Sequence, residues 1–324
     1  MKKTVLLLVG MYLLSACGGG VELVPTSTFT PEPSTPTIEV TMTPVLPVEL
    51  NGITAEGMNA PYGIAINSLG NIYVNDAGSN RVLVFDAGGN LLAKWDKQGS
   101  GEGEFKTLGF GSLAIDANDN VFVVDNGNSR IQKFDKDGNF MLQWGSQGKE
   151  DGQFIRAIGI TTDKDGNVYV TDDGNPYVQK FDNNGTFLMK FGGEGEGDGQ
   201  FSHATGIAVD AQGNIFVADY ENKRVQKFDA GGTFITSWQM GADVGVKGIP
   251  EAIAVDAQGK VYVSDYVLGR MQVFDNNGNF LWALGGKMIP ENPFKAPTGI
   301  AFGADGKLYV VNQGRNNISV YQLP

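Results

Sequence analysis

Apolar and polar residues alternate in short segments along the chain from residue 51 onward. One stretch shows the pattern well, with such segments at 206–210, 214–219, 224–229 and 234–239. The joints between them include AQGN and AGGT, where glycine supplies the positive φ that a tight hairpin needs. Short segments of this kind, separated by turn sequences, predict four antiparallel β-strands.

The four-segment pattern recurs along the chain. Its third segment reads RVLVFD, RIQKFD, YVQKFD, RVQKFD, RMQVFD and NISVYQ, ending at residues 86, 135, 182, 229, 275 and 322. The spacings between these ends are 49, 47, 47, 46 and 47 residues. A fixed period of this length, with several strands in each period, is typical of a β-propeller. The sequence therefore predicts an all-β fold, a six-bladed β-propeller with four-stranded antiparallel blades over 51–324.

The last repeat stops after its third strand, at NISVYQLP, so one blade lacks an outer strand. The segment 48–57 precedes the first inner strand and has no blade of its own. We expect it to pair beside 318–323 and to close the ring, because closure leaves no unpaired edge at that blade.

The chain begins with features of an exported protein. Lys2 and Lys3 precede an apolar run over 5–14 that is too short to span a bilayer stably, which predicts a signal peptide over 1–16. The sequence around Cys17, the chain's only cysteine, resembles the bacterial lipobox, in which the cysteine is lipidated. Residues 17–50 are rich in proline and threonine and predict a disordered tether. We expect an extracytoplasmic, lipid-anchored protein of the bacterial cell envelope.

Composition restricts the partners. The formal net charge of −12 argues against nucleic acid, whose binding depends on lysine and arginine neutralising phosphates. Protein, peptide or glycan ligands and a monomeric chain are expected instead.

The DKDGN stretches at 135 and 163 lack the glutamate that a Ca²⁺ loop needs at its twelfth position and are interpreted as hairpin turns. No metal site or cofactor is predicted.

Aspartate and arginine stand five residues apart in four repeats, at Asp76 and Arg81, Asp125 and Arg130, Asp219 and Arg224, and Asp265 and Arg270. In the last repeat both positions change together, to Asn312 and Asn317, which indicates a structural pair. The third repeat keeps Asp172, has Tyr177 in place of arginine and adds Asp173. Such an acid is expected to be solvated, with ligand binding as the alternative.

The segments GIAVD, GNIFVAD and NKRVQKFD, followed by a loop such as GGEGEGDGQF, resemble the NHL repeat family over about 270 residues. The resemblance implies the propeller fold. It leaves function open, because the family includes enzymes, extracellular sensor domains and RNA-binding modules. NHL-fold amidating lyases hold zinc with several histidines, whereas this chain has one, His203.

Ligands of propellers usually lie at the mouth of the axis, where the loops that enter the first strand meet those that leave the second. The candidate ligand-binding residues at these positions are Tyr62, Arg156, Asp173, His203, Tyr220, Glu251 and Tyr266. Thr205, Thr298 and Gln313 occupy equivalent positions. We expect Glu251, Arg156, His203 and Tyr266 to converge into a polar cup on one face.

Two functions fit this sequence. The first is a non-catalytic binding or interaction module that holds a protein, peptide or glycan at the axis mouth. The alternative is a metal-dependent lyase or lactonase-like hydrolase with its site at the axis. The alternative needs carboxylates and amides near the axis, and Glu251 is the only glutamate at a position leading into a first strand.

Overall fold

The computed structural model describes residues 47–241, 245–286 and 292–323. The predicted signal peptide at 1–16, the predicted lipidation site Cys17 and all but the end of the predicted tether at 17–50 lie outside the described residues. Within the described ranges, no helix is long and apolar enough to cross a membrane.

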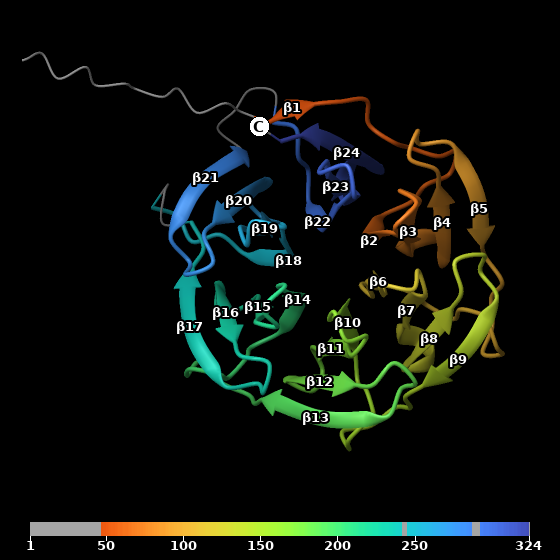
Figure 1. Cartoon of the computed structure of the whole chain (residues 1–324), viewed down its shortest axis with the longest axis horizontal. Coiled ribbons are helices and arrows are strands. Elements are labelled where there is room, and N and C mark those ends of the chain that lie inside the picture. Colours follow the sequence, from red (N-terminus) through yellow and green to blue (C-terminus); the bar gives the residue numbers. More distant parts are fainter. Residues whose placement is uncertain (1–46, 242–244, 287–291, 324) are drawn as a thin grey trace, which may run out of the picture. The chain divides into compact units, whose positions relative to one another are not determined.

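The described residues form six four-stranded antiparallel sheets, arranged as blades around a common axis (Figure 1). This confirms the predicted six-bladed all-β propeller. The inner strands are β2 (Pro61–Ile66), β6 (Leu113–Ile115), β10 (Ala157–Thr162), β14 (Ala204–Val209), β18 (Pro250–Val255) and β22 (Pro297–Phe302). The second strands are β3 (Ile72–Asp76), β7 (Val121–Asp125), β11 (Val168–Asp172), β15 (Ile215–Asp219), β19 (Val261–Asp265) and β23 (Leu308–Asn312).

The outer half of each blade follows the same order. The third strands are β4 (Arg81–Phe85), β8 (Arg130–Phe134), β12 (Tyr177–Phe181), β16 (Arg224–Phe228), β20 (Arg270–Phe274) and β24 (Asn317–Gln322). The outermost strands are β5 (Leu91–Trp95), β9 (Phe140–Trp144), β13 (Phe187–Gly192), β17 (Phe234–Gln239), β21 (Phe280–Gly285) and, in the last blade, β1 (Val48–Glu49). Short 3₁₀ turns η1 (Ala77–Ser79), η2 (Asn126–Asn128) and η3 (Gln313–Arg315) join the second and third strands of three blades.

The ring closes as the sequence predicts. Strand β1 pairs antiparallel with β24, with Val48 opposite Gln322 and Glu49 opposite Tyr321 (Figure 1). The backbone of Ile53 adds reciprocal hydrogen bonds with Ile318, and its side chain is buried in the core between the first and last blades. The two ends of the described chain therefore share one blade, and the closing strand begins before residue 51.

The hydrophobic core is divided among the contacts between neighbouring blades. Six clusters of buried side chains occur, and each joins residues of two adjacent blades. Trp95 of the first blade, for example, packs against Phe134 of the second with ring centroids 5.1 Å apart. Face-to-face packing of blades thus buries the apolar side of each sheet, which a single blade could not do alone.

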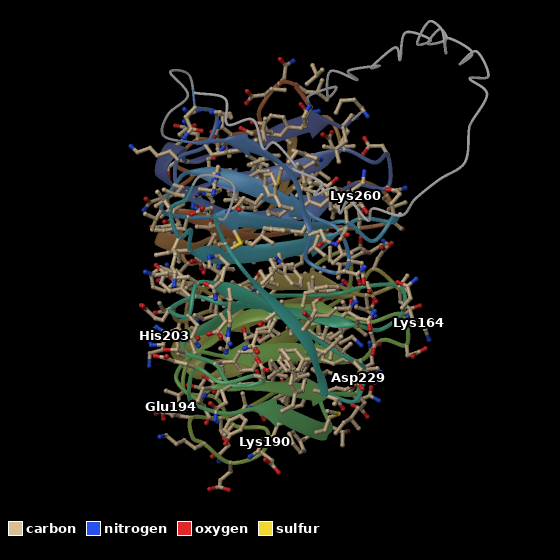
Figure 2. The ribbon with its side chains drawn as sticks, turned by 90° about the vertical axis from the view of Figure 1, so that its left-hand side faces the viewer. Lys164, Lys190, Glu194, His203, Asp229 and Lys260 are labelled. Carbon is tan, nitrogen blue, oxygen red and sulfur yellow. The ribbon has the colours of Figure 1, made fainter. Side chains whose placement is uncertain are left out.

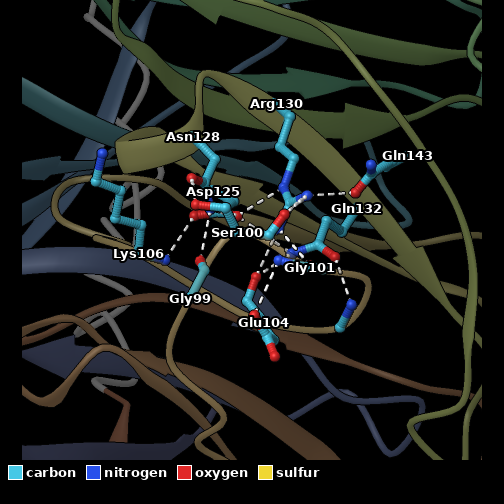
Figure 3. Close-up of polar contacts among 11 residues, drawn as sticks. Gly99, Ser100, Gly101, Glu104, Lys106, Asp125, Asn128, Arg130, Gln132 and Gln143 are labelled. Atoms are coloured by element: carbon cyan, nitrogen blue, oxygen red, sulfur yellow. Dashed lines mark hydrogen bonds and ion pairs between the residues drawn. The ribbon is translucent and has the colours of Figure 1, made fainter.

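The repeated aspartate and arginine form buried ion pairs. The Arg130 Nε lies 2.8 Å from an Asp125 carboxylate oxygen, and both side chains are buried. The same guanidinium donates to the backbone carbonyls of Gly101 and Glu104, so the pair also fixes the loop between blades (Figure 3). Equivalent pairs join Asp76 to Arg81, Asp219 to Arg224 and Asp265 to Arg270. The predicted structural role of these charges is confirmed.

The expectation that Asp172 is solvated is wrong. Its side chain is fully buried and accepts hydrogen bonds from the backbone N–H groups of Ile155 and Arg156. Loss of solvent raises the pKa of the Asp172 carboxyl. The two backbone donors offset only part of this shift, and within the described residues no guanidinium stands beside the carboxylate to stabilise its charge. Asp172 therefore holds the loop before β10 in the same way that the other blades do.

The two DKDGN segments are hairpin turns, as predicted. In each, the first aspartate accepts hydrogen bonds from backbone N–H groups two and four residues later, at distances of 2.9–3.0 Å. Asp135 and Asp163 thus replace backbone acceptors within the turn.

Candidate functional site at the mouth of the axis

The six inner strands surround an axial channel of about 390 Å³, lined mainly by aliphatic side chains and small residues. The strands approach so closely that a Cβ atom at Gly206 would lie 2.4 Å from the backbone oxygen of Glu251 on the next strand. Glycine is therefore required where β14 meets β18. This crowding brings the ends of all six inner strands near one another at the channel mouth.

Hydrogen bonds place the two kinds of loop at the same end of each blade. The N–H of Asp173, which follows β11, donates to the carbonyl of Arg156, which precedes β10. In the next blade, the N–H of Tyr220 donates to the carbonyl of His203 in the same way. Seen from the side, His203 lies at one face of the disc, and Lys164 and Lys260 lie in hairpin turns at the opposite face (Figure 2). The axis mouth on the His203 side is thus built from loops that differ between blades.

These loops surround a cavity of about 220 Å³, which we call the cup. Every blade contributes at least one residue to it. The cup is lined by Tyr62, Phe110, Arg156, Ile158, Asp173, His203, Thr205, Tyr220, Glu251, Tyr266 and Gln313. All seven candidate site residues are among them, so the expected convergence on one face is present. Their role in ligand binding stays a prediction.

Glu251 lies at the boundary between the cup and the axial channel. It lines both cavities, is only 7 % exposed, and its carboxylate accepts a hydrogen bond from the Tyr62 hydroxyl. Because it is buried, the glutamate also belongs to the packing around the axis.

Burial changes the proton affinity of this pair. Loss of solvent raises the pKa of the Glu251 carboxyl to about 7, and the nearby charge of Asp173 acts in the same direction. The hydrogen bond from Tyr62 opposes the shift by stabilising the carboxylate. The pKa of the Tyr62 hydroxyl is itself raised, first by burial and then by the charge of Glu251. Tyr62 therefore remains a hydrogen-bond donor at physiological pH.

Asp173 forms the second acidic group of the cup. Its side chain is only 6 % exposed, and one carboxylate oxygen pairs with the guanidinium of Arg156. The other oxygen lies 3.7 Å from His203 Nδ1, too far for a hydrogen bond. The side chains of Arg156 and His203 are half exposed, so they form the outer part of the wall. The deep part of the cup is acidic and its rim carries the basic groups.

Aromatic rings form much of the remaining wall. Tyr220 and Tyr266 are partly buried, and the Tyr266 hydroxyl donates to Gln313 Oε1 at 3.3 Å. Phe110 is exposed and packs edge-on against Tyr62 with ring centroids 5.5 Å apart. Phe110 was not among the predicted residues, because it lies in an irregular loop of the second blade. An aromatic side chain between two glycines, in GFG, was the available signal.

Two threonines at the mouth of the axis, Thr205 and Thr298, form hydrogen bonds between inner strands. Thr205 donates its hydroxyl to the backbone carbonyl of Glu251 at 3.1 Å, and Thr298 donates to the carbonyl of Pro61 at 3.3 Å. Each bond links one inner strand to its neighbour. These threonines therefore stabilise the ring of inner strands.

The residues do not fit a metal centre made of protein ligands. Within the described part of the chain, no group of three or more histidine, cysteine, aspartate or glutamate side chains is arranged to hold a metal ion. His203 Nδ1 lies 3.7 Å from Asp173 and 3.9 Å from Glu221, but these three side chains are not arranged to hold a metal ion.

Comparison with known proteins agrees with the architecture. The NHL repeat family matches residues 201–228, and a family described as a 6-bladed beta-propeller matches residues 59–143. No curated protein matches the sequence.

Solved structures share the fold at low identity. A streptogramin B lyase is 14 % identical with a TM-score of 0.61, over 85 % of this chain and 97 % of that chain. A gluconolactonase from Xanthomonas campestris is 15 % identical with a TM-score of 0.62, over 86 % and 99 %. The calcium-binding protein regucalcin from Agrobacterium tumefaciens is 13 % identical with a TM-score of 0.60, over 85 % and 94 %. These likenesses extend to the fold alone.

The repeats, the blade topology and the family matches agree with one another. The chain has the fold of a six-bladed β-propeller, and its residues 201–228 match the NHL repeat family.

Proposed function

We propose that the propeller is a ligand-binding module of the bacterial cell envelope, held at a membrane by lipid on Cys17, and that its ligand occupies the cup. The observation that carries this proposal is the contrast between repeated and variable positions. The aspartate and arginine pairs recur in four blades and are buried in the scaffold. The cup, in contrast, takes different polar and aromatic residues from each blade.

The chemistry of the cup supports recognition of a small polar ligand or the end of a peptide or glycan. A cavity of about 220 Å³ with convergent polar groups and aromatic walls is the usual form of a small-ligand site. The half-exposed guanidinium of Arg156 and the buried carboxylates of Asp173 and Glu251 offer charges of both signs. Aromatic rings supply contact area at low cost in side-chain entropy.

The test is a ligand screen followed by substitution. Mono- and disaccharides, dipeptides and small metabolites would be screened against the purified propeller by thermal shift, and hits titrated by calorimetry. We expect the double variant Arg156→Ala and Glu251→Gln to lose binding of any hit. Lys164→Ala with Glu196→Gln removes the same kinds of charge from exposed positions away from the cup and should leave affinity unchanged. Full retention of binding by the first variant would place the site elsewhere.

A second candidate function is catalysis by general acid or base chemistry at Glu251. A carboxyl with a pKa of about 7, in contact with a tyrosine hydroxyl, is suited to proton transfer near neutral pH. Two of the structural neighbours are described as a lyase and a gluconolactonase. Incubation with gluconolactone and with quinupristin, a compound present in one related lyase structure, tests this candidate. Turnover that disappears in Glu251→Gln would favour an enzyme, and its absence with both compounds favours the binding module.

A further inference from the structure

One carboxylate oxygen of Asp173 has no hydrogen-bond donor in the described part of the chain. The other oxygen pairs with Arg156, whereas this oxygen is buried, accepts no hydrogen bond and lies 3.7 Å from His203 Nδ1. The side chain is 94 % removed from solvent and lines the cup. A buried acceptor without a donor is unfavourable unless another molecule supplies the donor. The free oxygen of Asp173 therefore indicates that the cup is built for a ligand with an N–H or O–H group.

The charged groups around the cup indicate the sign of that ligand's charge. Glu251 forms no ion pair within the described residues, and the charge that acts on it is that of another carboxylate, Asp173. Glu221 adds a third carboxylate at the rim, 3.9 Å from His203 Nδ1. The arginine that faces these groups, Arg156, is already paired with Asp173. A positive charge entering the cup would relieve the repulsion among the carboxylates.

The aromatic walls of the cup also favour a positively charged ligand. Tyr62, Phe110, Tyr220 and Tyr266 line the same cavity as the two buried acids. The face of an aromatic ring carries partial negative charge and attracts ammonium groups, more strongly when water is excluded. Rings and carboxylates around one cavity are therefore complementary to an organic cation.

We propose that the ligand of the cup carries a primary ammonium group, which binds between the carboxylates of Asp173 and Glu251 and against the surrounding aromatic rings. This inference rests on the proposed binding function and names the chemistry of its ligand. A primary ammonium supplies the N–H donors that the free Asp173 oxygen lacks, whereas a quaternary ammonium has none. The cavity of about 220 Å³ suits a small amine or the amine end of a larger molecule.

Proton release accompanies this mode of binding. The groups that act on the Glu251 carboxyl are Tyr62 from β2 and Asp173 beyond β11. After burial, the charge of Glu251 in turn raises the pKa of the Tyr220 hydroxyl beyond β15. A cation beside Glu251 favours the carboxylate and lowers its pKa from about 7. Near neutral pH the protein must then lose a fraction of a proton when the amine binds. Calorimetric titration in buffers of different ionisation enthalpy measures that fraction.

The direct test uses four probes that share one ring: benzylamine, benzyl alcohol, benzoate and benzyltrimethylammonium. They are titrated into the purified chain at about pH 8, where Glu251 is mostly ionised. We expect benzylamine to bind, and each other probe to bind at least about tenfold more weakly because it lacks the charge, the donors or both. Asp173→Asn and Glu251→Gln should each weaken benzylamine binding by about tenfold or more. Two variants are needed because either buried site could disturb folding.

The control is Asp165→Asn, which removes the same charge from an exposed turn outside the cup and should change the affinity less than about twofold. Equal binding of benzoate or benzyl alcohol, or unchanged benzylamine binding in both folded cup variants, would overturn the ammonium inference. Failure of benzylamine to bind would overturn it as well. The proposed binding function would survive each of these results if the wider ligand screen gave a hit that Arg156→Ala with Glu251→Gln abolishes.

Discussion

The Tyr62 hydroxyl donates a hydrogen bond to the Glu251 carboxylate between two strands that are not neighbours in the ring. Tyr62 is the second residue of β2 and Glu251 the second residue of β18, and β22 lies between these inner strands (Figure 1). The bond therefore joins the first and fifth blades at the boundary between the axial channel and the cup. It holds a carboxyl with an unusual pKa at the floor of the proposed binding site.

Glu251 should make stability depend on pH. Its pKa of about 7 in the folded protein lies above its ordinary value of 4.5, so the folded state retains the proton while the unfolded chain loses it. The stability that the protonated carboxyl contributes is fully present below the ordinary pKa of 4.5 and is lost as the pH rises through the folded-state pKa of about 7. The free energy of unfolding that is lost over this pH range is on the order of 3 kcal/mol.

Glu251→Gln keeps the acceptor for Tyr62 but cannot ionise. We expect this variant to have the same melting temperature as the wild type in acid and a higher melting temperature than the wild type above neutral pH. Thermal unfolding followed across this range by circular dichroism measures the difference. Glu196→Gln, at an exposed position, serves as the control. Parallel pH curves for wild type and Glu251→Gln would contradict the assigned pKa.

Closure of the ring depends on Ile53. Its side chain is 6 % exposed in the core shared by the first and last blades, and its backbone pairs with Ile318. Ile53→Ala should lower the free energy of unfolding by about 2–4 kcal/mol, because it leaves a cavity in that core. Val48→Ala, on the same segment but 61 % exposed, should cost about 0.5 kcal/mol or less. Urea unfolding compares the two, and similar losses would argue against closure through a shared core.

The buried ion pairs predict a strong effect of neutralising one partner. Asp125→Asn leaves the Arg130 guanidinium buried without its carboxylate and should destabilise the protein by about 3–5 kcal/mol. Asp137→Asn removes an exposed charge next to Lys136 and should cost about 1 kcal/mol or less. Chemical denaturation measures both. A small effect at Asp125 would mean that the loop contacts of Arg130, and not the pair, hold the blade junction.

The anchor is tested at Cys17. Lipid on this residue would hold the protein at a membrane, because acyl chains contribute about 0.8 kcal/mol for each buried methylene. Cys17→Ala in the full chain should move the protein from the membrane fraction to the soluble fraction, as followed by detergent phase partitioning. Continued partitioning of the variant into detergent would refute lipidation, and Ser15→Ala, which keeps the cysteine, is the matched control.

The blade number and the strand positions could be predicted from the sequence because they depend on local patterns, and the closure of the ring because the last repeat lacks an outer strand. Alternating residues with glycine turns specify hairpins, and a period of 46 to 49 residues specifies the blades. The aspartate and arginine pairs were also accessible, because the partners stand five residues apart on either side of one turn. The positions of the cup residues followed from the same repeat, since loops at equivalent places in each blade must face the same end.

The chemistry of the cup was decided by the tertiary structure. Tyr62 and Glu251 are 189 residues apart, and only the closed ring brings them into contact. Asp172 is buried because backbone N–H groups of the loop before β10 reach it, and no property of its neighbours in sequence indicates this. The pKa of Glu251 and the unpaired oxygen of Asp173 depend on how six blades together exclude water from the axis mouth. Solvent exclusion is a property of the assembled ring, so it becomes visible only when all the blades are in place.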